Sequence, residues 1–171
     1  MELIKNIFYW NLKFIPFTVL KNIQKQKLML PLYHIVSDDK VPHVVHCYSY
    51  KNIKQFENDL NILLKHFNPI SLGDLMKIIN KKGELHQKSF LLTIDDGYRE
   101  IYDIIAPILL KKSIPAVFFL NSDFVDNKTM SYRNKASLLI DSLENKNYHF
   151  NDLQLLLKEN EEKLQSIFRA A

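Results

Sequence analysis

Glycine is scarce in this chain, and its scarcity disfavours several classes of enzyme. The 171 residues include only three glycines, Gly73, Gly83 and Gly97, whereas average proteins contain roughly 7% glycine. Isolated glycines cannot build the glycine-rich phosphate loops of dinucleotide enzymes and P-loop NTPases. Nor can they build the GxSxG turn that presents the nucleophilic serine of α/β-hydrolases. The chemistry of this chain is therefore expected to lie elsewhere.

Cysteine and concentrated charge are also missing. A single cysteine, Cys47, excludes an internal disulfide and a CxxC zinc site. The 23 Lys and Arg residues exceed the 19 Asp and Glu residues by only four. They form no basic block, so we expect no nucleic-acid partner. With 47% apolar residues, the chain has the composition of a globular protein with a sizeable core.

Long hydrophobic runs are absent as well. The best candidate, residues 7–20, is interrupted by Asn11, Lys13 and Pro16 and is shorter than the roughly 20 residues of a membrane span. No small-residue cleavage site follows it, so we predict no cleavable signal peptide and favour a cytoplasmic or membrane-peripheral location. Two interpretations stay open for the N-terminal segment, residues 1–28: a core-packing or partner-binding helix, which we favour, and weak association with a membrane surface.

Hydrophobic spacing predicts alternating strands and helices in the centre of the chain. We expect a strand over residues 29–36 and a helix over residues 51–67 with an apolar stripe from Ile53 to Phe67 that includes Leu64. Ser71 and Asp74 form a capping pair for a second helix that ends near Gly83. The residues expected on its buried face are Leu72, Leu75, Ile78 and Ile79.

Residues 89–120 predict a strand–helix–strand unit. The nearly continuous apolar run 89–94 is typical of a strand buried on both faces in a parallel sheet. A helical pattern follows over residues 101–109, in which Pro107 predicts a kink or a restarted first turn. Residues 116–120 then predict a second buried strand. We therefore expect an α/β fold with three or four strands in all.

The character of the chain changes after Asp126. Helical patterns cover residues 135–144 and 152–168, and we expect no strand after Leu120. We therefore divide the chain into an N-terminal apolar segment (1–28), a partial α/β domain (29–126) and a helical segment (127–171). The helical segment is interpreted as an insertion.

Asp95 and Asp96 are the residues that indicate chemistry. They end the first buried strand, and the carboxyl ends of parallel strands are where α/β proteins build their sites. Adjacent carboxylates repel each other, so a divalent cation, a basic partner or solvent must offset the repulsion. A cation would also acidify a bound water that one carboxylate could deprotonate. The spacing alone leaves a simple turn open, with either aspartate capping the next helix.

At these residues the sequence resembles a known family. LLTIDDGY at 91–98 and APILLKKSIPAVFFL at 106–120 are similar to the first motif and the following βαβ unit of the polysaccharide deacetylases, the NodB-homology domain. Ile94 and Val117 replace the usual aromatic residue and threonine. Tyr33-His34, the helical pattern of 56–64 and the sequence ISL at 70–72 support the resemblance, which spans residues 29–126.

The resemblance implies an incomplete (β/α) barrel that hydrolyses non-peptide carbon–nitrogen bonds in carbohydrate metabolism. The reaction would be metal-assisted removal of an acetyl group from an N-acetyl sugar, and the substrate would be an acetylated glycan or a small acylated compound. By this resemblance Asp95 is the general base and Asp96 is a metal ligand. Zinc is the expected ion, with nickel or cobalt as alternatives. Tyr98 and His34 are candidates to line the site, although His34 is more simply read as a packed, hydrogen-bonded histidine.

The sequence departs from the family at the second metal-ligand motif, H-[ST]-x-x-[HP]. The only histidine after Asp96 is His149, four residues before Leu153, which cannot bind a metal. We therefore expect a truncated barrel with an incomplete metal site and little or no activity. A non-catalytic accessory fragment or pseudoenzyme that acts as an interaction module is the alternative. A helix-rich interaction protein stays open as well if the aspartate pair lies off a parallel strand.

A second histidine pair needs a separate interpretation. His43 and His46 have a spacing that can bind a metal on a helix. Pro42 precedes them, and we expect a loop there. We therefore do not count this pair as a metal site.

Overall fold

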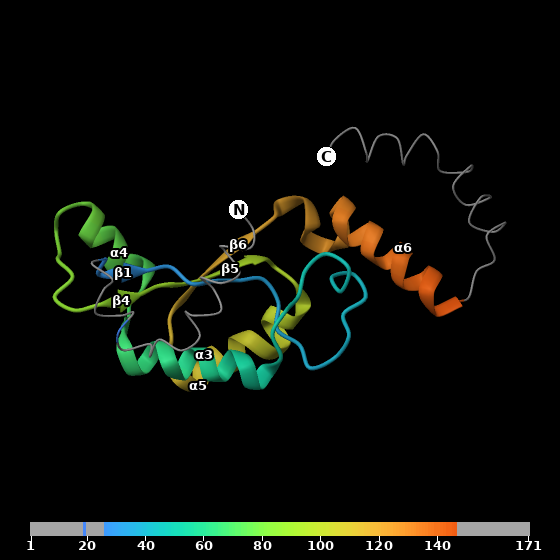
Figure 1. Cartoon of the computed structure of the whole chain (residues 1–171). Helices are drawn as coiled ribbons and strands as arrows, with labels where there is room; N and C mark the ends of the chain where they lie inside the picture. Colours follow the sequence, from blue (N-terminus) through green and yellow to red (C-terminus); the bar gives the residue numbers. More distant parts are fainter. Residues whose placement is uncertain (1–18, 20–25, 147–171) are drawn as a thin grey trace, which may run out of the picture.

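The computed structural model describes residue 19 and residues 26–146 (Figure 1). Most of the N-terminal apolar segment and the helix expected over residues 152–168 lie outside this part of the chain. Among the described residues, none of the helices combines the length and the apolar character needed to cross a membrane.

The strands form two parallel sheets of three strands each. The first has the order β1 (Leu28–Met29), β4 (Ser89–Phe90), β3 (Asn68–Pro69). The second has the order β2 (Leu32–Tyr33), β5 (Leu92–Asp96), β6 (Ala116–Leu120). Only Leu91 separates β4 from β5, so one stretch of chain supplies the central strand of both sheets. The α/β prediction is confirmed, but the expected count of three or four strands is too low for the described residues.

The prediction of a single strand over residues 29–36 is wrong. That stretch is divided into β1 and β2, which belong to different sheets. Pro31 lies between them and has no N–H to donate to a ladder. Its carbonyl oxygen instead accepts hydrogen bonds from the backbone N–H and the hydroxyl of Thr93, at 2.9 and 3.0 Å.

Helix α3 (Ile53–His66) is capped at its N-terminus by Asn52, whose side chain accepts a hydrogen bond from the N–H of Gln55. Its buried residues are Phe56, Leu60 and Leu63, as the spacing predicted. The prediction that Leu64 belongs to the buried stripe is wrong, because Leu64 is 37% exposed. The buried side chains pack with Phe90, Leu92 and Ile94 of the central strands in the main core.

Helix α4 (Leu72–Ile79) confirms the capping prediction and contradicts the burial prediction. The Ser71 hydroxyl accepts from the N–H of Asp74, whose carboxylate accepts from the N–H of Ser71. None of the residues of α4 is buried, and Ile79 is 62% exposed. Amphipathic spacing identifies the face that can be buried but not whether another element covers it. The helix also ends four residues before Gly83, with Lys81 in the left-handed region.

The segment after β5 contains η1 (Ile101–Ile105), a turn of π-helix, followed by α5 (Ala106–Lys112). Pro107 is the second residue of α5, directly after the π-helical turn, and the backbone of Ile105 and Ala106 at this junction is helical. Proline cannot donate a hydrogen bond to the preceding turn. The expected kink or restarted first turn is not seen as a break: the helix changes from π to α within one continuous run. α5 lies beside α3 on one side of the sheet, where Lys112 donates a hydrogen bond to Asn61 at 2.7 Å (Figure 1).

Strand β6 is where the sequence predicted a strand, but the predicted burial is wrong. It is an edge strand that pairs with β5 on one side only, and Phe119 and Leu120 are 56% and 66% exposed. A short 3-10 segment, η2 (Ser122–Asn127), leads to α6 (Tyr132–Lys146). α6 confirms the helix expected over residues 135–144.

Candidate active site

Asp95 and Asp96 end the central strand of the second sheet. β5 has β2 on one side and β6 on the other, and the two aspartates are its last residues. They lie opposite Phe119 and Leu120 in the parallel ladder. This location contradicts the interpretation of the pair as a plain turn in a helix-rich protein.

The backbone turns sharply at the end of β5. Asp96 and Gly97 both have left-handed backbone angles, with φ of 74° and 76°. Aspartate tolerates this region better than most residues, and glycine adopts it freely. A Cβ at position 97 would lie 2.8 Å from Cδ2 of Leu120 on β6. The contacted methyl group is the end of the Leu120 side chain, which is 66% exposed and can move aside. The left-handed backbone angle is therefore the main reason for glycine at position 97.

The register of β2 brings His34 to Asp95. Leu32 and Tyr33 of β2 pair with Thr93 and Ile94 of β5. The next residues of the two segments, His34 and Asp95, therefore lie beside each other. Nε2 of His34 lies 3.9 Å from Oδ2 of Asp95, and both side chains are about one-third exposed. Asp95 therefore has a titratable imidazole next to it and remains accessible to water.

Two tyrosines lie beside the aspartate pair. The ring of Tyr48 contacts that of His34, with centroids 5.5 Å apart, and its hydroxyl interacts with Tyr98. Burial first, and then the neighbouring Tyr98, raise the pKa of Tyr48 far above its ordinary value. Burial also raises the pKa of Tyr98, although its hydrogen bonds with Asn134 and Tyr48 act in the opposite direction. Both phenols therefore keep their protons at neutral pH and can serve as neutral hydrogen-bond donors.

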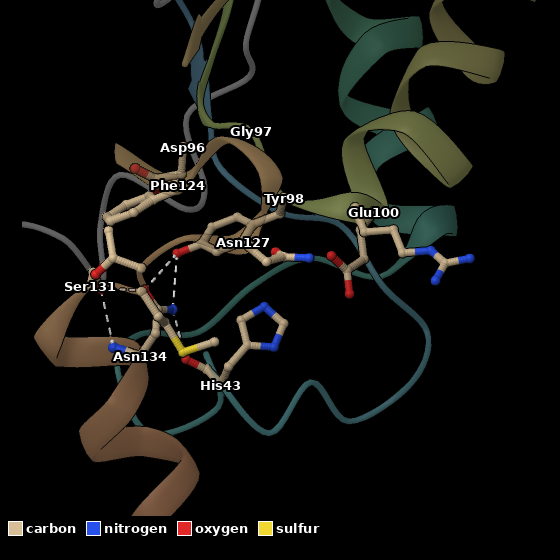
Figure 2. A pocket seen from close by; sticks show the side chains of 12 residues that line it. His43, Asp96, Gly97, Tyr98, Glu100, Phe124, Asn127, Ser131 and Asn134 are labelled. Atoms are coloured by element: carbon tan, nitrogen blue, oxygen red, sulfur yellow. Dashed lines mark hydrogen bonds between the residues drawn. The ribbon is translucent and has the colours of Figure 1, made fainter. Parts of the chain in front are cut away.

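A cavity of about 290 Å³ adjoins Asp96. Asp96 and Tyr98 line one wall, His43 comes from the preceding loop, and Phe124 and Asn134 come from the segment after β6 (Figure 2). Asp95 and His34 do not line this cavity. The two carboxylates therefore have different surroundings: Asp96 borders a half-open cavity, and Asp95 faces an accessible histidine.

Asn134 holds the walls of the cavity together. It is 5% exposed, and its amide nitrogen donates to the carbonyl oxygen of His43 at 2.8 Å and to the Tyr98 hydroxyl at 3.1 Å. Its oxygen accepts from the hydroxyl of Ser131, the residue before α6 (Figure 2). Sequence reasoning missed Tyr48. No local pattern marks its contacts with His34 and Tyr98, which lie 14 and 50 positions away along the chain.

His43 and His46 do not act as a pair. The His43 ring stacks obliquely near Tyr98, with centroids 5.3 Å apart, whereas His46 turns toward Asp141 and Glu144 on α6. Within residues 26–146, His46, Asp141 and Glu144 form the one group of three or more side chains close enough to share a metal ion. Asp95 and Asp96 belong to no such group in this part of the chain.

A parallel sheet whose central strand ends in adjacent carboxylates, next to a histidine and a lined cavity, defines an α/β protein with an enzyme-like site. The family model described as polysaccharide deacetylase matches residues 82–167, half of the chain. The chain therefore belongs to the polysaccharide deacetylase family.

Solved structures agree with this assignment. A de-N-acetylase from Aggregatibacter actinomycetemcomitans is 27% identical, with a TM-score of 0.51, and the match covers 63% of this chain and 45% of that one. IcaB from Ammonifex degensii is 21% identical, with a TM-score of 0.54 and coverages of 70% and 51%. The deacetylase PplD from Streptococcus pyogenes, in complex with acetate, is 15% identical, with a TM-score of 0.51 and coverages of 66% and 51%.

The chain thus spans about half the length of these structures. The last two matches show the shared fold alone. No curated protein sequence matches the chain.

Proposed function

We propose that this chain is the N-terminal part of a metal-dependent deacetylase that removes acetyl groups from an N-acetylated glycan. The observation that carries the proposal is the adjacent pair Asp95 and Asp96 at the end of the central parallel strand. Membership of the polysaccharide deacetylase family and the 27% identity to a de-N-acetylase support the choice of an acetylated glycan as substrate.

Asp95 is proposed as the general base. Its side chain is one-third exposed, so a water molecule can reach it and give up a proton while the water oxygen attacks the amide carbon. The carbon–nitrogen bond then breaks, acetate leaves and the sugar nitrogen takes up a proton. His34, at 3.9 Å from Asp95, is placed to pass that proton on because the ring nitrogens of an imidazole can accept and donate a proton.

Asp96 is proposed as one ligand of a divalent ion, with zinc as the first choice and nickel or cobalt as alternatives. When bound, such an ion polarises the amide oxygen and lowers the pKa of water. The residues described here do not fit a complete site, because Asp96 has no two further ligand side chains within reach. No step of the reaction is therefore derived through the ion, and we expect little or no turnover from the 171-residue chain.

The cavity next to Asp96 is proposed to receive the acyl sugar. Tyr98 supplies a protonated phenol at its wall, which can donate a hydrogen bond to a sugar or acetyl oxygen. Phe124 and Met130 supply an apolar surface, which suits the non-polar face of a sugar ring or an acetyl methyl group.

The incomplete ligand set also favours a second candidate, a non-catalytic accessory fragment. Acetate release from an N-acetylated chitooligosaccharide separates the two. We expect release by a longer form that continues through the downstream reading frame and carries an H-[ST]-x-x-H motif, and little or none by the 171-residue form. Robust turnover by the 171-residue form would contradict the proposed incompleteness. Absence of release from both forms would favour the accessory fragment.

A further inference from the structure

A second group of metal-ligating side chains lies where the loop before α3 meets α6. Nε2 of His46 is 3.9 Å from Oδ1 of Asp141 and 3.7 Å from Oε2 of Glu144. One ligand atom from each of the three side chains lies within 4.8 Å of the other two. None of these residues lines the cavity beside Asp96.

The backbone under this cluster is held in place by hydrogen bonds. The hydroxyl of Ser137 on α6 donates to the carbonyl oxygen of Pro42 at 2.6 Å and accepts from the N–H of His46 at 3.2 Å. Ser137 precedes Asp141 by four residues and Glu144 by seven, so all three lie on one face of α6. The loop and the helix therefore present His46 and the two carboxylates to each other from fixed supports.

We propose that His46, Asp141 and Glu144 form a second divalent-metal site, separate from Asp96, that binds zinc. An imidazole and two carboxylates are an established type of ligand set for this ion, with Zn–N and Zn–O bonds of roughly 2.0–2.2 Å. Tetrahedral ligands at those bond lengths lie roughly 3.4 Å apart. The His46 separations of 3.7 and 3.9 Å need to close by only a few tenths of an ångström, and water completes the coordination.

Lys40 pairs with one of the proposed ligands. Its ammonium nitrogen lies 2.5 Å from Oδ1 of Asp141. The Lys40 side chain is 50% exposed, whereas the Asp141 side chain is 11% exposed. Lys40 can therefore move into solvent when a metal ion takes over its pairing with the buried carboxylate. Asp141 therefore exchanges an ammonium group for a metal ion, and Lys40 competes with zinc.

This competition makes the inference testable by calorimetric titration of the metal-stripped 171-residue protein with zinc chloride. We expect binding that weakens at least tenfold in His46→Gln and in Glu144→Gln. Asp96→Asn is expected to leave this binding unchanged, because Asp96 contributes no ligand to the cluster. Lys40→Met is expected to tighten binding severalfold. His86→Gln, which changes an exposed histidine, is the matched control and is expected to bind like the unchanged protein.

The outcomes separate this site from the proposed active site. Zinc binding that is lost in Asp96→Asn but kept in His46→Gln would overturn the inference while supporting the proposed role of Asp96. Unchanged binding in His46→Gln and Glu144→Gln, with no gain in Lys40→Met, would show that the cluster is an ion-pair group only. Circular dichroism of each variant confirms folding. Glu144, whose side chain is 59% exposed, is the position least sensitive to loss of packing.

Discussion

At the scale of single residues, the site depends on a backbone turn that gives two identical side chains different surroundings. Asp95 faces His34 across the strand ladder, whereas Asp96 adopts a left-handed conformation and borders the cavity. Gly97 continues the left-handed turn next to Leu120, and this turn separates the surroundings of the two carboxylates. The aspartate pair is therefore suited to two roles, base and ligand, only while the turn keeps its shape.

Gly97→Ala tests that requirement. A residue with a Cβ at φ of 76° costs roughly 1–2 kcal/mol, and the new methyl group would meet Leu120 at 2.8 Å. We expect the free energy of unfolding, measured with urea, to fall by about 2 kcal/mol. Gly73→Ala is the matched control, because the new Cβ there would make only an ordinary contact at 3.6 Å and alanine favours a helix. Equal stabilities of the two variants would contradict the role given to Gly97.

At the scale of elements, the helices and strands are positioned largely by local signals. The Ser71–Asp74 capping box sets the start of α4, and the asparagine cap sets the start of α3. These signals are visible in the sequence because each involves residues at most four positions apart. The exposure of α4 and β6 is not visible there, since it depends on what packs against them.

The capping box of α4 gives a pH-dependent prediction. Hydrogen bonds from the Ser71 hydroxyl and backbone, then the nearby Lys77, hold the pKa of Asp74 below its ordinary value. The carboxylate therefore adds stability above that ordinary pKa, and this contribution is lost as the pH falls through the lowered folded-state pKa. We expect wild type to be more stable than Asp74→Ala at pH 6, with a difference that shrinks steadily toward pH 2.

Urea unfolding of both proteins across this pH range is the measurement. A difference that stays constant or grows on acidification would contradict the assignment. Asp39→Ala, in the loop before α3 and exposed, controls for the loss of one surface carboxylate.

At the scale of the whole molecule, sequence reasoning succeeded where the information is local. The buried run at 89–94 identified the central strands, and the position of Asp95 and Asp96 at its end followed from it. Tyr48 and the cluster around His46 were missed because their partners are distant along the chain, up to 98 residues for His46 and Glu144. The division of residues 29–36 between two sheets was missed for the same reason.

The whole molecule also corresponds to about half of the solved deacetylase structures it matches. Within residues 26–146, both edges of the second sheet are formed by strands with exposed apolar residues, Leu32 on β2 and Phe119 on β6. Apolar side chains on an unpaired strand edge favour association with further strands. This arrangement is consistent with the proposal that the barrel is incomplete in this chain.

The most direct test of the central proposal, hydrolysis by the carboxylates at the end of β5, is acetate release by the longer form with Asp95→Asn. The amide keeps the shape of the side chain but cannot accept a proton from water, so we predict a fall in kcat of at least 100-fold with little change in KM. Asp103→Asn, which alters an exposed carboxylate paired with Arg99, should keep nearly full activity. An Asp95→Asn enzyme as active as Asp103→Asn would contradict the account.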